Sequence, residues 1–99
     1  MHFAIQLLDR PDSAEPRAKL LNEHLTFVEA NLDRIQVAGP LRDETGQTRG
    51  SLYVIAATDQ ADALTFVSSD PYFDAGVWNE PVIHEFLGVA GGWVGGKNW

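Results

Sequence analysis

The chain has 99 residues, of which 44% are hydrophobic and 21% charged, and its formal net charge is −7. This length is typical of one domain, so we expect residues 1–99 to form a single domain with a tail rich in glycine and tryptophan from about residue 88. The negative charge and the lack of a Lys/Arg cluster argue against binding to nucleic acid or to an anionic membrane. Without cysteine, a leader pattern or a membrane-spanning stretch, a disulfide-free cytoplasmic protein is expected.

The first half of the chain predicts a strand, a long helix and a second strand. Apolar and less apolar residues alternate over residues 3–7, which is typical of a strand. Apolar residues then recur at helical spacing over residues 14–31, with His24 in a row beside them. A short strand over residues 35–38 is expected to stop at the Gly-Pro pair that follows. The polar residues 41–49 then predict an exposed hairpin loop.

The second half predicts a strand, a shorter helix and a final strand. Residues 51–57 carry apolar side chains on both faces of a strand. A helix follows a capping residue, Thr58 or Asp59, and ends before a proline that disfavours helical geometry in Asp70. The last strand covers about residues 82–87. The glycine-rich segment after it predicts a flexible tail.

The order of these elements, β-α-β-β-α-β, is that of the ferredoxin-like arrangement in the α+β class. It predicts a four-stranded antiparallel sheet with two helices on one face. Two helices leave the other face of the sheet uncovered, although that face also carries apolar residues such as Leu52 and Val82. An exposed apolar sheet is a liability, and a second copy of the chain is the simplest cover. We therefore predict a homodimer packed sheet to sheet.

Three distant segments have the residue types of one site: His24, residues 38–40 (Ala-Gly-Pro) and residues 69–72 (Ser-Asp-Pro-Tyr). Histidine can carry a proton near neutral pH, and a carboxylate can orient its ring. Each residue also has a simpler interpretation. His24 could be a histidine at the edge of the core, bonded to a backbone carbonyl or to water, and Asp70 could cap a short helical turn. Capping and catalysis can coexist, because a carboxylate has several acceptor positions.

The remaining candidates point to a small-molecule pocket more than to a metal or nucleotide site. Tyr72 and Trp78 belong either to the core, to an interface or to the apolar walls of a pocket. His2 and His84 form no metal-ligand spacing with another histidine or with a close carboxylate pair, so no metal site is predicted. No phosphate loop, dinucleotide fingerprint or Gly-x-Ser-x-Gly elbow is present. No cofactor is predicted.

Taken together, the chain resembles the YCII-related family of small proteins from its first strand to about Phe86. The residues that carry this resemblance are Arg17, His24-Leu25, Ala38-Gly39-Pro40-Leu41, Gly46, Gly50-Ser51-Leu52, Asp70-Pro71-Tyr72 and Ala75-Gly76. The resemblance implies a ferredoxin-like fold of the dimeric α+β barrel type. It also implies that His24 and Asp70 match the family's His–Asp pair, with Ser51 as a polar residue near it. The tail after Phe86 departs from the family pattern.

We therefore predict a small metal-independent enzyme in which His24 acts as general acid or base and Asp70 fixes its tautomer. Arg17 would meet an anionic substrate, and the other predicted substrate-binding residues are Ser51, Tyr72 and Trp78. Proton abstraction next to a carbonyl, in an isomerisation or elimination, suits such a pair. Lyase chemistry on a small cyclic or aromatic molecule is what the resemblance implies. The alternative is a non-catalytic module that binds a small ligand, or a structural dimer, in which the pair supports the fold.

Overall fold

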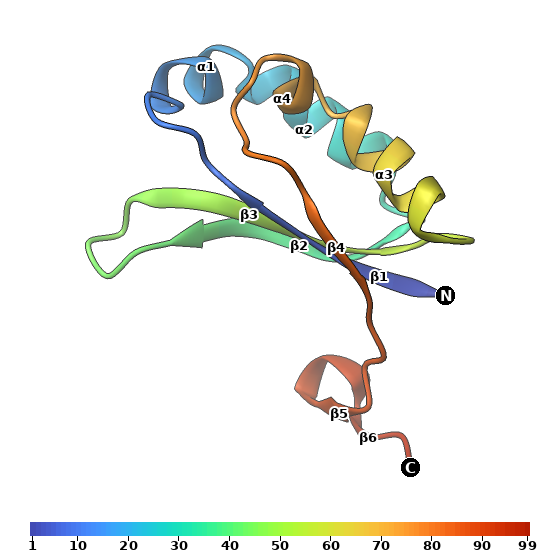
Figure 1. The fold of residues 1–99 in the computed structure, drawn as a ribbon. Coiled ribbons are helices and arrows are strands. Elements are labelled where there is room, and N and C mark those ends of the chain that lie inside the picture. The colour runs from blue at the N-terminus through green and yellow to red at the C-terminus, as the bar shows by residue number, and fades with distance from the viewer.

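The computed structural model describes residues 1–99 as a four-stranded antiparallel sheet with its helices on one side (Figure 1). The strands of this sheet lie in the order β2-β3-β1-β4. Its arrangement confirms the predicted α+β, ferredoxin-like fold. None of the helices has both the length and the apolar character needed to traverse a bilayer. In chain order the elements are β1 (His2–Leu8), α1 (Ala14–Lys19), α2 (Leu21–Ala30), β2 (Ile35–Arg42), β3 (Thr48–Ala56), α3 (Gln60–Ser68), α4 (Pro71–Asp74), β4 (Val82–Glu85), β5 (Ala90–Gly91), η1 (Gly92–Val94) and β6 (Gly96–Lys97).

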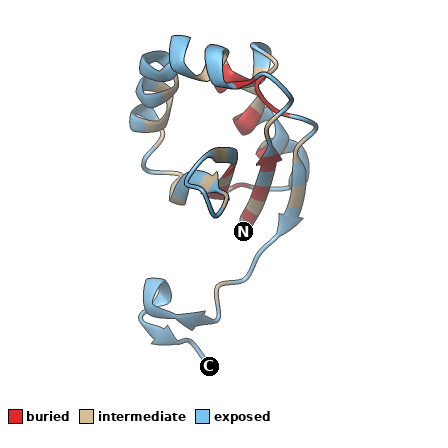
Figure 2. Cartoon of the chain, turned by 90° about the vertical axis from the view of Figure 1, so that its left-hand side faces the viewer, coloured by how far each residue is buried: buried red, intermediate tan, exposed pale blue.

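The core lies between the sheet and the helices. Because side chains alternate along a strand, Phe3, Ile5 and Leu7 of β1 all point to one face, and all three are buried. Tyr53 and Ile55 of β3 lie opposite Ile5 and Phe3 and are buried on the same face. Figure 2 shows the buried residues gathered on the inner strands and beneath the helices. The rest of the chain contributes Ala57, Ala63, Phe66, Val67, Tyr72, Val77 and Trp78 to this cluster.

The single helix predicted over residues 14–31 is in fact two helices. They are separated by Leu20, whose backbone angles (φ −104°, ψ 11°) lie in the bridge region outside the helical one. Hydrogen bonds of helical spacing continue on both sides of the break. The N–H of Leu20 donates to the carbonyl of Pro16 at 3.0 Å, and the N–H of His24 donates to that of Leu20 at 2.9 Å. The break therefore redirects the chain just before His24 without leaving these backbone groups unpaired.

Strand β2 continues through the Gly-Pro pair to Arg42, so the prediction that this pair stops the strand is wrong. Proline cannot donate to a strand ladder, but it is tolerated on an edge strand, where one side has no partner. β2 is such an edge strand, because it pairs only with β3. The predicted loop over residues 41–49 is consequently a shorter turn, and β3 already begins at Thr48.

Two aspartates begin the short helices that flank the core. Of the two predicted candidates, Asp59 caps α3, since its carboxylate accepts a hydrogen bond from the N–H of Asp62 at 2.8 Å. Asp70 caps α4 by accepting from the N–H of Tyr72 at 2.9 Å, with a proline at the first helical position. The predicted capping role of Asp70 is confirmed. The cap fixes the place of its carboxylate within the core.

The residues after β4 leave the sheet and lie on the side away from the helices (Figures 1 and 2). The sequence predicts a flexible tail here, but β5 and β6 pair as a small antiparallel hairpin around η1. Its tryptophans stay outside the core cluster, because Trp93 is 86% exposed and Trp99 is 76% exposed. The tail thus presents exposed tryptophans on the side of the sheet that the helices leave uncovered (Figure 1).

Gly50 marks a close approach between β3 and β1. A methyl group at this position would run into the backbone carbonyl of Leu7. Gly50→Ala should lower the free energy of unfolding by about 1–3 kcal/mol, because a strand backbone cannot give way as a flexible side chain can. Urea unfolding measures this change. Gly39→Ala, made where a methyl meets open space, is the control and should cost less than about 1 kcal/mol; equal losses would contradict the close approach.

Candidate active site

His24 of α2 and Asp70 of α4 meet in the structure, although 46 residues separate them in the chain. The ring nitrogen Nδ1 of His24 lies 3.0 Å from Oδ1 of Asp70 and 2.8 Å from Oδ2. An ionised carboxylate only accepts hydrogen bonds, so Nδ1 carries the hydrogen and Nε2 is left as the acceptor. The side chain of Asp70 is fully buried, whereas that of His24 is 16% exposed. This geometry allows the pair to take up and release a proton at Nε2.

Asp70 receives two further hydrogen bonds. The backbone N–H of Tyr72 donates to Oδ1 at 2.9 Å, and the hydroxyl of Tyr53 donates to Oδ2 at 2.8 Å. A buried charge is tolerated only where such donors replace water. The carboxylate is therefore held in one position by groups from three different elements.

Tyr53 lies within β3 at the centre of the sheet, and its hydroxyl has only Asp70 as a partner. Burial, followed by the negative charge of Asp70, raises the pKa of Tyr53 far above its ordinary value of 10.0. Its hydroxyl therefore remains a donor throughout the physiological range. No motif in the sequence marks Tyr53 as a partner of Asp70. The one available signal is strand alternation, which puts Tyr53 on the same face as Ser51.

Aromatic side chains hold the imidazole of His24 from the side. The ring of Tyr72 stacks on that of His24, with centroids 4.1 Å apart and planes only 9° apart. Trp78 stands edge-on to Tyr72 at 5.6 Å and to His24 at 6.5 Å. Trp78 does not line the cavity beside His24 but a separate hollow that includes Gln60. Its predicted contact with substrate therefore stays a prediction.

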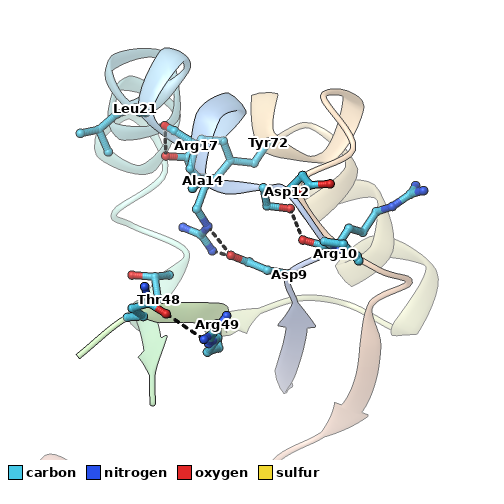
Figure 3. Close-up of a pocket in the computed structure, with 13 residues that line it drawn as sticks. Asp9, Arg10, Asp12, Ala14, Arg17, Leu21, Thr48, Arg49 and Tyr72 are labelled. Atoms are coloured by element: carbon cyan, nitrogen blue, oxygen red, sulfur yellow. Dashed lines mark hydrogen bonds and ion pairs between the residues drawn. The ribbon is translucent and has the colours of Figure 1, made fainter. Parts of the chain in front are cut away.

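Arg17 of α1 forms a second fixed group beside the pair. Its Nε and Nη2 donate to both carboxylate oxygens of Asp9 at 2.8 Å, and Nη2 also donates to the hydroxyl of Ser51 at 3.0 Å. Figure 3 shows Arg17 reaching from its helix toward Asp9 at the end of β1. The guanidinium carbon lies 5.2 Å from the centre of the Tyr72 ring. Nη1 of Arg17 and the hydroxyl hydrogen of Ser51 remain available to another acceptor.

These polar groups converge on a cavity of about 350 Å³ between α2 and the strands β2 and β3. Arg17, His24, Ser51 and Tyr72 line it, so the cavity brings four predicted site residues together, while Asp70 lies directly behind His24. A larger open hollow of about 840 Å³ adjoins it and shares Arg17 and Tyr72 (Figure 3). Few polar groups in a mostly apolar concavity are typical of a small-molecule site. The remaining lining residues are Leu21, Leu25, Val28, Ala38, Gly39, Pro40, Thr48, Leu52 and Tyr53.

Two features of this site were not predicted from the sequence. Asp9 fixes Arg17, and Tyr53 donates to Asp70. No motif marks either contact, and the contact between Tyr53 and Asp70 joins elements that only the tertiary fold brings together. No group of three or more His, Cys, Asp or Glu side chains is placed to hold a metal ion.

The fold and the site define a ferredoxin-like α+β protein with a buried His–carboxylate pair at a small-molecule cavity. The model of the YCII-related domain family matches residues 1–87 of the chain. The chain therefore belongs to the YCII-related domain family, as the sequence resemblance predicts. The hairpin tail lies beyond the matched residues.

Among solved structures, the chain is similar to the 5-chloro-2-hydroxyhydroquinone dehydrochlorinase of Burkholderia phenoliruptrix AC1100, in complex with 2,5-dihydroxybenzoquinone. The two are 27% identical, with a TM-score of 0.80 over 93% of this chain and 97% of that chain. An uncharacterized NIPSNAP domain protein from Burkholderia xenovorans has 11% identity and a TM-score of 0.46 over 91% and 96% of the two chains. A dimeric protein of ferredoxin-like fold from Bacteroides fragilis NCTC 9343 has 18% identity and a TM-score of 0.45 over 86% and 95%. Comparison with the curated proteins finds no match.

The buried hydroxyl of Tyr53 should make the protein sensitive to alkali. Because the pKa of Tyr53 is raised in the folded state, the unfolded chain loses this proton first, and stability is retained below pH 10 and lost as the pH rises beyond it. Relative to Tyr53→Phe, the wild type should lose about 1.4 kcal/mol of unfolding free energy per pH unit above that point. Urea unfolding from pH 8 to 11 measures both proteins. Parallel pH dependences would contradict the burial of a neutral hydroxyl.

Proposed function

We propose that the chain is a lyase- or isomerase-type enzyme that moves a proton on a small cyclic or aromatic molecule carrying ring oxygens. The observation that carries this proposal is the contact between His24 and buried Asp70 at the wall of a cavity. Similarity to a dehydrochlorinase that was solved with a ring compound supports the substrate class. No metal or organic cofactor is included in the proposal.

In the proposed reaction, Nε2 of His24 takes a proton from a hydroxyl group, or from a carbon next to a carbonyl. Asp70 stabilises the imidazolium that forms and keeps the ring in the tautomer that exposes Nε2. The same nitrogen can then return the proton to another atom of the substrate. A positioned acid–base group of this kind contributes about 10²–10⁴ in rate.

Arg17 and Ser51 are proposed to bind the substrate oxygen on which negative charge develops. Their donors are fixed before substrate arrives, because Asp9 holds two of the guanidinium nitrogens and Nη2 bonds Ser51. Donors that need no rearrangement stabilise a developing oxyanion most effectively, and one such donor is worth about 10²–10³ in rate. Asp9 partly neutralises Arg17, so the site favours an oxygen with growing charge over a strongly anionic group.

The cavity is of the size expected for a single substituted ring, since small-molecule sites run from about 300 to 1,000 Å³. We propose 5-chloro-2-hydroxyhydroquinone as the first compound to test. Moving one hydroxyl proton to the chlorine-bearing carbon makes that oxygen a carbonyl. Loss of chloride with its bonding electrons, and of a second hydroxyl proton, then gives 2-hydroxy-1,4-benzoquinone and HCl. A His–Asp pair can make each of the proton transfers in this reaction.

Replacing His24 tests the proposal directly. The wild type should release chloride from this compound, and His24→Ala should lower kcat by about 10²–10⁴ because the proton acceptor is gone. Its melting temperature should change little, since two donors to Asp70 remain and water can enter the partly exposed place that the ring leaves. His2→Ala, at an exposed histidine of β1, is the control and should retain activity. Equal turnover by His24→Ala and the wild type would contradict the catalytic role, and so would a wild type that releases no chloride.

A non-catalytic binding or structural module is the alternative, and the buried cap at Asp70 favours it. Asp70 serves the fold by starting α4, so the pair could exist for stability alone. In that case loss of His24 leaves a buried carboxylate short of a donor, at a cost of about 1–3 kcal/mol. A large loss of stability in His24→Ala, together with no turnover by the wild type, would favour this alternative.

We also propose that a second copy of the chain covers the open face of the sheet. Alternation along the strands puts Leu8, Leu52 and Val82 on the face opposite the core, and Phe86 follows β4 beside His2, at the far end of β1 from Leu8. Val82 is 50% exposed and Phe86 is 44% exposed, and the apolar tail lies on the same side (Figure 1). Apolar surface gathered in this way marks an association site. In a two-fold pair, each such residue would be buried twice.

Sedimentation velocity should therefore find a dimer at micromolar concentration. Val82→Lys should weaken association at least tenfold, because each of the two copies then brings a charged amine into the proposed apolar contact. Leu64→Lys is the matched control, since Leu64 is 44% exposed but lies on α3, on the helix side. That variant should remain dimeric. A wild type that sediments as a monomer would refute the sheet-to-sheet pair.

A further inference from the structure

We propose that Tyr53 is a positioning residue that acts through Asp70: its hydroxyl takes up part of the carboxylate's charge and so limits how strongly Asp70 draws a proton onto the ring of His24. The inference deepens the proposed function, since it rests on His24 and Asp70 being the proton-carrying pair. It adds to that pair a third member from the middle of the sheet.

The geometry brings two donors to a single oxygen. Oδ2 of Asp70 lies 2.8 Å from Nδ1 of His24 and 2.8 Å from the hydroxyl of Tyr53. Both Tyr53 and Asp70 are about 1% exposed, so solvent does not screen the contact. The Tyr53 ring is itself fixed, because Phe66 packs edge-on against it with centroids 5.5 Å apart. The hydroxyl is thus held toward the carboxylate by the packing of the core.

Holding Asp70 in place does not require this hydroxyl. The helix cap fixes Oδ1, and Nδ1 of His24 contacts both oxygens. The hydroxyl instead changes how much of the negative charge of Asp70 acts on the imidazole of His24. A buried carboxylate with fewer donors attracts a proton onto the neighbouring ring more strongly, and a ring that is already protonated cannot act as a base. When two donors share one carboxylate oxygen, each weakens the hydrogen bond that the other makes to it.

The other titratable groups around the pair have partners of their own. Tyr72 from α4 stacks on the imidazole and donates its hydroxyl to the carbonyl of Arg17. Arg17 from α1 is paired with Asp9, beyond the end of β1. Among these neighbours, only Tyr53 offers a side-chain donor to the carboxylate besides His24 itself.

Tyr53→Phe removes the hydroxyl and keeps the ring. In this variant the Nδ1–H···Oδ2 bond of His24 should strengthen, so the low-field proton resonance of Nδ1–H should move further downfield in the NMR spectrum. The acidic limb of the pH profile of kcat/KM should move up by about 0.5–1 pH unit, because the ring is protonated over a wider range. Activity at pH 6 should then fall about 3–10-fold, with little loss on the alkaline plateau. Tyr53→Leu, which also lacks the donor, should shift both readouts in the same direction.

Ser13→Ala is the matched control for loss of a buried hydroxyl. The buried hydroxyl of Ser13 lies 2.6 Å from the carbonyl oxygens of both Arg10 and Val77 and donates its one hydrogen to them, away from the pair. Ser13→Ala should lower the free energy of unfolding but leave the Nδ1–H resonance of His24 and the pH profile of kcat/KM unchanged. In an Asp70→Asn background, Tyr53→Phe should no longer shift the profile, because the charge that it modulates is gone.

The NMR readout needs no substrate, which separates this inference from the proposed function. A downfield shift without any turnover would support the role of Tyr53 at the pair and count against the enzyme. Turnover that depends on His24, with a resonance and an acidic limb that do not move in Tyr53→Phe, would overturn the role of Tyr53 alone. A shift of the limb to lower pH would overturn it as well.

Discussion

The structure depends on one buried charge, the carboxylate of Asp70, and on the donors that make its burial tolerable. An unpaired carboxylate inside a protein costs several kcal/mol, so each donor to Asp70 constrains the element that carries it. His24 brings α2 toward the core, the N–H of Tyr72 begins α4, and Tyr53 connects both to the centre of the sheet. Satisfying this charge therefore assembles a histidine, a helix start and a strand at one point. The cavity opens where they meet.

A second charge pair gives the opposite wall its rigidity. Arg17 is bound at three of its donor positions by Asp9 and Ser51, and its guanidinium lies over the ring of Tyr72. Tyr72 is thus in contact with both walls, because its other neighbour is the imidazole of His24. Such a site is largely formed before a ligand enters, which reduces the ordering cost of binding.

Local rules in the sequence predict much of this fold. Alternation in β1 and the Asp-Pro start of α4 are determined by neighbouring residues, and both agree with the structure. The outcome at Pro40 depends instead on which strand lies at the edge of the sheet, and the helix break depends on the conformation of Leu20. Neither can be read from spacing. The His24–Asp70 contact follows from residue types and family resemblance, because two residues 46 positions apart carry no local signal of a contact.

Strand β3 shows how one segment serves both faces of the molecule. Alternation along β3 puts Ser51 and Tyr53 on the face that the helices cover, and Leu52 and Val54 on the opposite face. A shift of one residue in the register would exchange these two sets, moving the polar side chains outward and the apolar ones into the site. The seven paired positions with β1, together with the close approach at Gly50, hold that register. The pairing that builds the sheet is therefore also what delivers the hydroxyl of Tyr53 to Asp70.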